Sequence, residues 1–218
     1  MTVAMLVLEP IFEADLPPEQ YVYRPGRYAQ QAALDVEDLL FHGHREAVEA
    51  NLADYFGSIP HAELLKSVGR RVVDRRVLHL IKQWRECRVE ETDDRGWKTR
   101  TTEAKDQRRG IPQGSPISPL LANLYMRRFV LAWKQRGLER SLGSKIETYA
   151  DDLVILRRKG KPEEALRPWK GPWPGSLSFD SICFRKHGLS AEIILIYRPE
   201  RQYQSGFQAD PSPRHRPI

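Results

Sequence analysis

The chain has 218 residues, which is enough for one sizeable domain with its own core and excludes a short peptide. Its 35 Lys and Arg residues outnumber 29 Asp and Glu residues, and this excess favours a polyanionic partner such as nucleic acid. Two cysteines cannot build a disulfide framework and no apolar run reaches the ~20 residues of a membrane span, so we expect a cytoplasmic protein without membrane contact.

Three segments in the first half of the chain have the apolar spacing of amphipathic helices. Apolar side chains recur in them every three or four residues, which places those side chains on one face. The predicted helices cover residues 29–40, 61–68 and 75–84. Asp74 directly precedes the third one and predicts an N-cap. Pro17, Pro18 and residues 24–27 predict a loop, and residues 1–10 lack the basic flank of a signal peptide.

A strand is predicted between the first two helices. Val48, Ala50 and Leu52 alternate with Glu49 and Asn51, as expected for a half-buried strand, and the strand should end near residues 54–56. Further along, the polar residues 88–108 predict a hairpin or a flexible connection.

A loop rich in proline and glycine precedes the longest predicted helix. The turn-forming residues around Gln113 give a rigid, low-profile backbone that a flat ligand or a nucleic-acid strand could approach closely. They are Gly110, Pro112, Gly114 and Pro116. Ser118 then begins a helix that should end at Gly137, which is a typical stop residue.

The next segment predicts a β-hairpin with two aspartates at its tip. Runs of strand-forming residues, 146–149 and 153–156, flank Ala150, Asp151 and Asp152. The adjacent carboxylates repel each other unless the tip is solvated or a divalent cation lies between their oxygens. This stretch alone leaves both interpretations open.

The composition changes beyond residue 165. Half of the 16 prolines follow residue 161, and only residues 191–197 still have the pattern of a strand. We therefore expect a domain over residues 1–165 and a disordered tail over 166–218, or a tail produced by a shifted reading frame.

Four motifs in this order resemble the reverse transcriptase domain of bacterial group II intron-encoded proteins. They are YRPGR, NLADYFGSIPH, RRGIPQGSPISPLLANLYM and YADD, and the resemblance covers roughly residues 6–165. It implies an α+β fold: a right-hand polymerase palm with a ferredoxin-like βαββ sheet and part of the helical fingers. The implied function is RNA-directed DNA polymerase, with an RNA template, a primer and deoxynucleotide triphosphates as partners.

The resemblance also implies a metal site at the hairpin tip. Two Mg²⁺ ions would stabilise the attacking 3′ oxygen and the leaving pyrophosphate. Asp151 would be a direct ligand, and Asp152 a ligand or near-ligand. The third metal carboxylate of the family falls at Asn51, whose amide carries no charge, so metal affinity and rate should both fall. Neither Glu49 nor Asp54 is an obvious substitute.

Other roles are implied by the same motifs. Tyr55 resembles the residue that packs under the sugar and excludes a 2′-hydroxyl, with an ordinary core aromatic as the alternative. Phe56 shares this nucleotide-binding motif and suits the core better. Gln113 resembles the residue near the nascent base pair. Arg24 and Arg27 resemble contacts of the fingers to template phosphates, the alternative being exposed loop charges.

By this resemblance we expect the outer fingers and the thumb to be absent, and therefore an impaired polymerase fragment. One alternative is a non-catalytic protein that binds intron RNA, which would show salt-sensitive RNA binding without nucleotide incorporation. Another is a palm-like metal nuclease or cyclase, which would need no template. The last is an unfolded remnant without cooperative melting.

Overall fold

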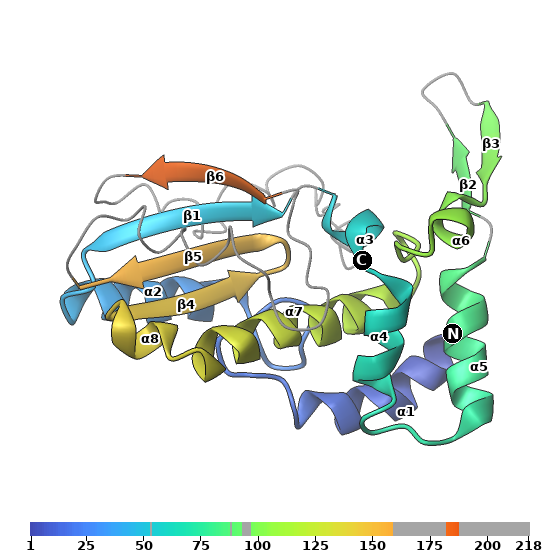
Figure 1. Ribbon diagram of the computed structural model, residues 1–218, viewed down its shortest axis with the longest axis horizontal. Helices are drawn as coiled ribbons and strands as arrows, with labels where there is room; N and C mark the ends of the chain where they lie inside the picture. Colours follow the sequence, from blue (N-terminus) through green and yellow to red (C-terminus); the bar gives the residue numbers. More distant parts are fainter. Residues whose placement is uncertain (53, 88, 93–96, 159–181, 188–218) are drawn as a thin grey trace, which may run out of the picture.

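The computed structural model describes residues 1–52, 54–87, 89–92, 97–158 and 182–187 (Figure 1). The helices are α1 Thr2–Glu13, α2 Ala29–Phe41, α3 Tyr55–Ser58, α4 His61–Val68, α5 Arg75–Arg85, α6 Glu103–Gln107, α7 Ser118–Gln135 and α8 Leu138–Ser141. The strands are β1 Glu46–Leu52, β2 Val89–Thr92, β3 Lys98–Thr101, β4 Ser144–Tyr149, β5 Asp152–Arg157 and β6 Ile182–His187.

Four strands form one antiparallel sheet in the order β4-β5-β1-β6. The chain runs from β1 through α7 into the β4–β5 hairpin, and β5 then pairs with β1, so the mixed helix and strand content agrees with the expected α+β class. Figure 1 shows the sheet above the C-terminal part of α7, whereas α1, α4 and α5 lie near the N-terminal part of that helix.

The two faces of the sheet pack against different helices. On β5, Leu153 and Ile155 belong to the large core cluster that includes α7, because side chains alternate along a strand. Val154 and Leu156 point to the other face and pack with Val36 of α2. Because β5 is covered on both faces at this level, its central residues are fully buried.

Most predicted elements are present with small shifts at their ends. The α5 helix begins as expected, since the Asp74 carboxylate accepts a hydrogen bond from the Arg76 N–H at 2.7 Å. However, β1 ends at Leu52 instead of near residues 54–56. Asp54 adopts a left-handed φ of 48°, which turns the chain into α3 and cannot continue a strand.

The α1 helix was not predicted from the sequence. It buries Leu8 and Phe12 against the core, whereas Val3, Leu6 and Val7 are at least 60% exposed. Apolar residues therefore occur on both faces of the helix, and this removes the one-sided pattern that reveals a buried face.

The polar segment 88–108 contains a hairpin rather than a flexible connection alone. Strands β2 and β3 pair antiparallel and project beyond the body of the molecule (Figure 1). Within the segment 166–218, expected to be disordered, residues 182–187 instead form β6 at the edge of the sheet. The predicted strand 191–197 lies outside the described residues. In the described part of the chain, no helix is both long and apolar enough to cross a membrane.

One buried carboxyl group should make the stability of the fold depend on pH. Burial and the nearby charges of Glu19 and Asp35 raise the pKa of Glu147 to about 8, partly offset by Lys134 and Lys145. The folded chain therefore keeps a proton that the unfolded chain releases near pH 4.5, so stability should fall as the pH rises from about 5 to about 8.

We expect this fall to be roughly 4 kcal/mol, because each pKa unit corresponds to about 1.4 kcal/mol, and it is measured by urea unfolding at a series of pH values. The Glu147→Gln variant should lose that pH dependence, because its amide does not titrate. If the free energy of unfolding of the variant falls equally steeply with pH, Glu147 is not the group responsible.

Candidate functional site

The two adjacent aspartates lie at a tight turn between β4 and β5. Tyr149 pairs with Asp152, so Ala150 and Asp151 alone form the turn. Ala150 takes a left-handed φ of 58°, a strained conformation for a residue with a Cβ atom. The Leu52 N–H donates a hydrogen bond of 2.9 Å to the Asp151 carbonyl and so joins the turn to the end of β1. Both carboxylates are partly exposed at this edge of the sheet.

Asn51 lies directly beside Asp152. The two residues are paired across β1 and β5, and paired residues of antiparallel strands project on the same side of the sheet. The Asn51 Nδ2 donates a hydrogen bond of 2.6 Å to Oδ1 of Asp152. A carboxylate at position 51 would lie beside Asp152, whereas the amide offers no charge and occupies one carboxylate oxygen.

The oxygen ligands at the hairpin tip are partly suited to a divalent metal ion. Asp151 and Asp152 supply hard carboxylate oxygens of the kind that Mg²⁺ prefers. Among the described residues, no group of three or more His, Cys, Asp or Glu side chains is placed to hold a metal ion. Glu49 sits two positions before Asn51 on β1 and pairs with Val154 rather than with either aspartate. The tip therefore offers two carboxylates and one neutral amide to a cation.

The aromatic pair after β1 separates into a buried and a partly exposed ring. Tyr55 is 4% exposed, and its hydroxyl donates a hydrogen bond of 2.8 Å to the Ala122 carbonyl. These contacts favour the core interpretation of Tyr55. Phe56, for which the sequence favours the core, is partly buried: it packs against the core cluster and edge-on against Tyr23 at 6.4 Å between ring centroids.

Tyr23 is a site residue that sequence reasoning missed. Burial and the nearby Asp151 carboxylate raise the pKa of its phenol, so the ring lies within electrostatic reach of the hairpin tip. It adopts a left-handed φ of 55°, and its side chain is 47% exposed. The signal available in the sequence was an aromatic residue directly before the Arg24-Pro25-Gly26 turn.

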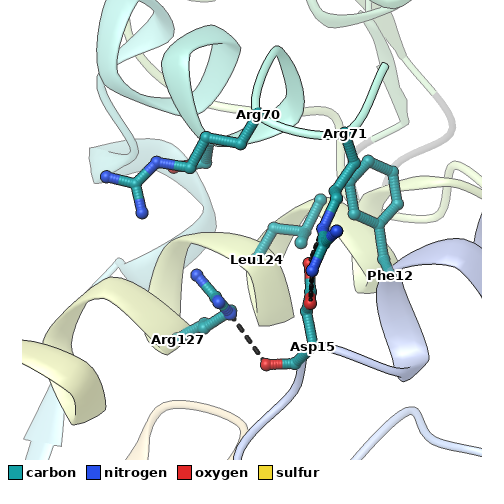
Figure 2. Close-up of a pocket in the computed structure, with 7 residues that line it drawn as sticks. Phe12, Asp15, Arg70, Arg71, Leu124 and Arg127 are labelled. Carbon is teal, nitrogen blue, oxygen red and sulfur yellow. Dashed lines mark hydrogen bonds and ion pairs between the residues drawn. The ribbon is translucent and has the colours of Figure 1, made fainter.

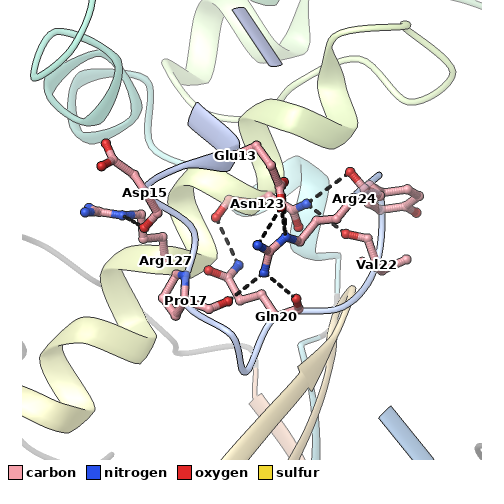
Figure 3. Close-up of polar contacts among 9 residues, drawn as sticks. Glu13, Asp15, Pro17, Gln20, Val22, Arg24, Asn123 and Arg127 are labelled. Carbon is pink, nitrogen blue, oxygen red and sulfur yellow. Dashed lines mark hydrogen bonds and ion pairs between the residues drawn. The ribbon is translucent and has the colours of Figure 1, made fainter. Parts of the chain in front are cut away.

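Arg24 does not point freely into solvent. Its guanidinium forms hydrogen bonds of 2.6 to 3.1 Å with the Glu13 carboxylate and bonds of 2.6 and 2.7 Å with the Pro17 and Gln20 carbonyls (Figure 3). The side chain is 5% exposed. These contacts favour a structural role rather than contact with a template phosphate.

The neighbouring Arg27 also has a partner within the chain. Its guanidinium lies over the ring of Tyr21, 5.3 Å from the centroid. Asn123 on α7 also holds this loop, because its Nδ2 donates to the Val22 carbonyl at 2.8 Å and its backbone carbonyl accepts from Nε2 of Gln20 at 3.1 Å. The loop that carries both arginines and Tyr23 is therefore well anchored.

The loop that carries Gln113 is anchored to α3 through glycine. The Gly110 N–H donates to the Ile59 carbonyl at 2.8 Å, and the Ile111 N–H donates to the Phe56 carbonyl at 2.9 Å. Gln113 itself is exposed a few residues further on. These bonds hold the backbone of the loop against the backbone of residues 56–59.

We expect Gly110→Ala to destabilise the chain by roughly 2 kcal/mol in urea unfolding. Gly110 has a φ of 89°, and an added Cβ atom would lie 3.1 Å from the Gly57 carbonyl oxygen. Gly114→Ala is the matched control, because Gly114 has a similar φ of 79° but open space around it. It should cost only about 1 kcal/mol. Equal losses in the two variants would show that the close approach of Gly110 to Gly57 contributes nothing.

Comparison with known proteins places this geometry in a family. The model of the reverse transcriptase (RNA-dependent DNA polymerase) family matches residues 2–168. Protein YkfC of Escherichia coli (strain K12) is 30% identical over 79% of this chain and 52% of its own length. The group II intron-encoded protein LtrA of Lactococcus lactis subsp. cremoris is 28% identical over 60% of this chain and 21% of its length.

A solved structure supports the same fold. The telomerase from Candida albicans, in complex with a fragment of telomeric RNA, superposes with a TM-score of 0.54 over 85% of this chain and 35% of its own, at 10% identity. Such low identity is evidence about the fold alone. The chain spans about half of the length of YkfC and about a fifth of that of LtrA.

Proposed function

The chain belongs to the reverse transcriptase (RNA-dependent DNA polymerase) family, and on this basis we propose that it is a palm with part of the fingers whose metal site is one carboxylate short. In this proposal the chain binds RNA as a template or as intron RNA. Nucleotide incorporation is strongly reduced because the site holds divalent metal weakly.

The contact between Asn51 and Asp152 is the observation that carries this proposal. An aspartate at position 51 would share a metal ion with Asp152 across the two strands, whereas Asn51 donates its N–H to Asp152 at 2.6 Å. The hydrogen bond stabilises the carboxylate without a cation. Removing one negative charge also weakens the attraction for a divalent ion at this edge of the sheet.

Asp151 and Asp152 would hold the metal. When bound, Mg²⁺ would stabilise the negative charge that develops on the attacking 3′ oxygen and the leaving pyrophosphate. The residues of the chain would contribute position: the hydrogen bond from Leu52 fixes the turn that carries Asp151. The pairing of β1 with β5 fixes Asp152.

Phe56, Tyr23 and Gln113 would form the nucleotide side of the site. The partial exposure of Phe56 and its edge contact with Tyr23 support the view that Phe56, rather than the buried Tyr55, would pack against the sugar of a deoxynucleotide triphosphate. Gln113, exposed on the anchored loop, would approach the nascent base pair.

RNA binding without catalysis is the second candidate function. The net charge of +6 favours a polyanion whether or not chemistry occurs. In this reading the chain would hold intron RNA while the metal site stays non-functional.

Two measurements on the same preparation test the proposal. Binding of a labelled RNA oligonucleotide is followed at increasing salt, and extension of a primer on an RNA template is followed with Mg²⁺ or Mn²⁺. We expect salt-sensitive RNA binding together with weak or absent extension. Extension that needs no template would favour a different metal-dependent activity, and a folded chain without RNA binding would contradict both candidate functions.

A further inference from the structure

A pocket lined by three arginines lies on the side of α7 that faces away from the sheet. It forms where the end of α1, the end of α4 and the middle of α7 meet, and its volume is about 240 Å³ (Figure 2). The lining residues are Phe12, Asp15, Ser67, Arg70, Arg71, Leu124 and Arg127. None of them belongs to the hairpin tip or to the aromatic pair, so this pocket is separate from the candidate site.

The pocket carries more positive than negative charge. Arg71 is paired with the Asp15 carboxylate, with a hydrogen bond of 2.5 Å from its Nε. Arg127 donates from Nε to the Asp15 backbone carbonyl at 2.8 Å, which holds the side chain in place without neutralising it. Arg70 forms no ion pair within the described residues. Three guanidinium groups therefore share one carboxylate.

The arrangement leaves two guanidinium groups available to an anion. Figure 2 shows Arg70 and Arg127 on one side of the pocket, whereas Arg71 turns toward Asp15. Burial and the positive charges of Arg70 and Arg71 lower the pKa of Arg127, against the opposing effect of Asp15. An anion between Arg70 and Arg127 would relieve this repulsion.

We propose that Arg70 and Arg127 bind a phosphate group of an RNA backbone that passes over this side of α7. Guanidinium groups donate in a planar fork that suits phosphate oxygens, and two such groups can engage one phosphate from two directions. The apolar Phe12 and Leu124 form the floor of the pocket next to the charges. The inference rests on the RNA binding proposed above and adds a contact remote from the metal site.

The test compares Arg70→Gln with a matched control. A labelled single-stranded RNA oligonucleotide is titrated with the full chain at several salt concentrations. Arg70→Gln should raise the Kd about tenfold and lower the slope of log K against log salt by about 0.7, the value for one lost phosphate contact. Arg140→Gln removes the same charge from an exposed position on α8 and should change the Kd less than about twofold.

Arg127→Lys separates phosphate recognition from charge alone. It retains the positive charge but loses the guanidinium fork, so the Kd should still rise severalfold. The melting temperature of each variant is measured, because Arg127 also bonds to the Asp15 backbone. Arg70 is exposed, so its variant remains informative even if Arg127→Lys unfolds.

Clear outcomes overturn the proposal. Equal losses of RNA affinity for Arg70→Gln and Arg140→Gln would mean that RNA binding depends only on the net charge of the chain. A polyglutamate peptide that binds in an Arg70-dependent manner, while RNA binding is unaffected by Arg70→Gln, would assign the pocket to an acidic protein segment. If the unaltered folded chain binds no RNA, the proposed function fails together with this one. If the chain binds RNA and Arg70→Gln leaves the Kd unchanged, only the proposal for the pocket is contradicted.

Discussion

Replacing Asn51 by aspartate is expected to raise primer extension on an RNA template at least about 100-fold in the presence of Mg²⁺ or Mn²⁺. The new carboxylate would lie in the place of an amide whose nitrogen is 2.6 Å from Oδ1 of Asp152. Two carboxylates so close repel each other until a divalent cation binds between them, so the substitution replaces a hydrogen bond by a metal-dependent contact.

Two further variants establish whether the gain comes from the metal site. Asp151→Ala in the Asn51→Asp background should abolish extension, because it removes the proposed direct metal ligand. Asn51→Ala removes the hydrogen bond to Asp152 without adding a carboxylate, and should remain inactive. If Asn51→Ala gains activity as well, the amide acts by blocking Asp152 rather than by lacking charge.

Thermal stability gives a readout that does not depend on catalysis. Without metal, Asn51→Asp should melt at a lower temperature than the unaltered chain, and added Mg²⁺ should restore it, because a ligand that binds only the folded state stabilises that state. A folded Asn51→Asp variant that neither gains activity nor responds to Mg²⁺ would reject the metal site. RNA binding alone would then be the better-supported function.

Replacing Arg24 by alanine is expected to destabilise the chain by about 3 kcal/mol. The guanidinium is bonded to Glu13 and to the Pro17 and Gln20 carbonyls, while its side chain is 5% exposed. Alanine would leave the Glu13 carboxylate and two carbonyl groups without this donor. Removing the buried partner of a hydrogen-bonded ion pair has effects of this size here because Glu13, which is 27% exposed, and the two carbonyl groups lose the same donor.

Urea unfolding of Arg24→Ala measures this effect, with Lys98→Ala as the control. Lys98 pairs with Glu90 at 2.7 Å, but its side chain is 65% exposed, so its loss should cost less than about 1 kcal/mol. A role of Arg24 in contacting the template predicts the reverse pattern: little loss of stability and a clear loss of RNA affinity. That pattern would restore the phosphate-contact interpretation for this residue.

The sequence by itself determined the elements whose signals are local. Helical spacing predicted α2, α4 and α5, and the side chain of Asp74 caps α5 as expected. The two aspartates between strand-forming runs predicted the β4–β5 hairpin, which closes with a two-residue turn. Such signals lie within a few residues of one another, so no distant partner is needed to read them.

Only the tertiary structure decided which side chains are available for function. Tyr55 and Phe56 are neighbours in the sequence, yet Tyr55 bonds to Ala122 on α7 and is buried, whereas Phe56 remains partly exposed. The loop residue Arg24 gave no local sign of its contact with Glu13, a residue of the helix that the sequence did not reveal. Burial depends on which segments meet in space.

The arginine pocket arises in the same way. It joins Asp15, Arg70 and Arg127, three residues that lie far apart along the chain and come together only when α1 and α4 pack on α7. Each arginine alone is an ordinary basic residue in the sequence. Their common charge becomes a binding feature because packing holds like charges together and leaves them fewer carboxylates than guanidinium groups.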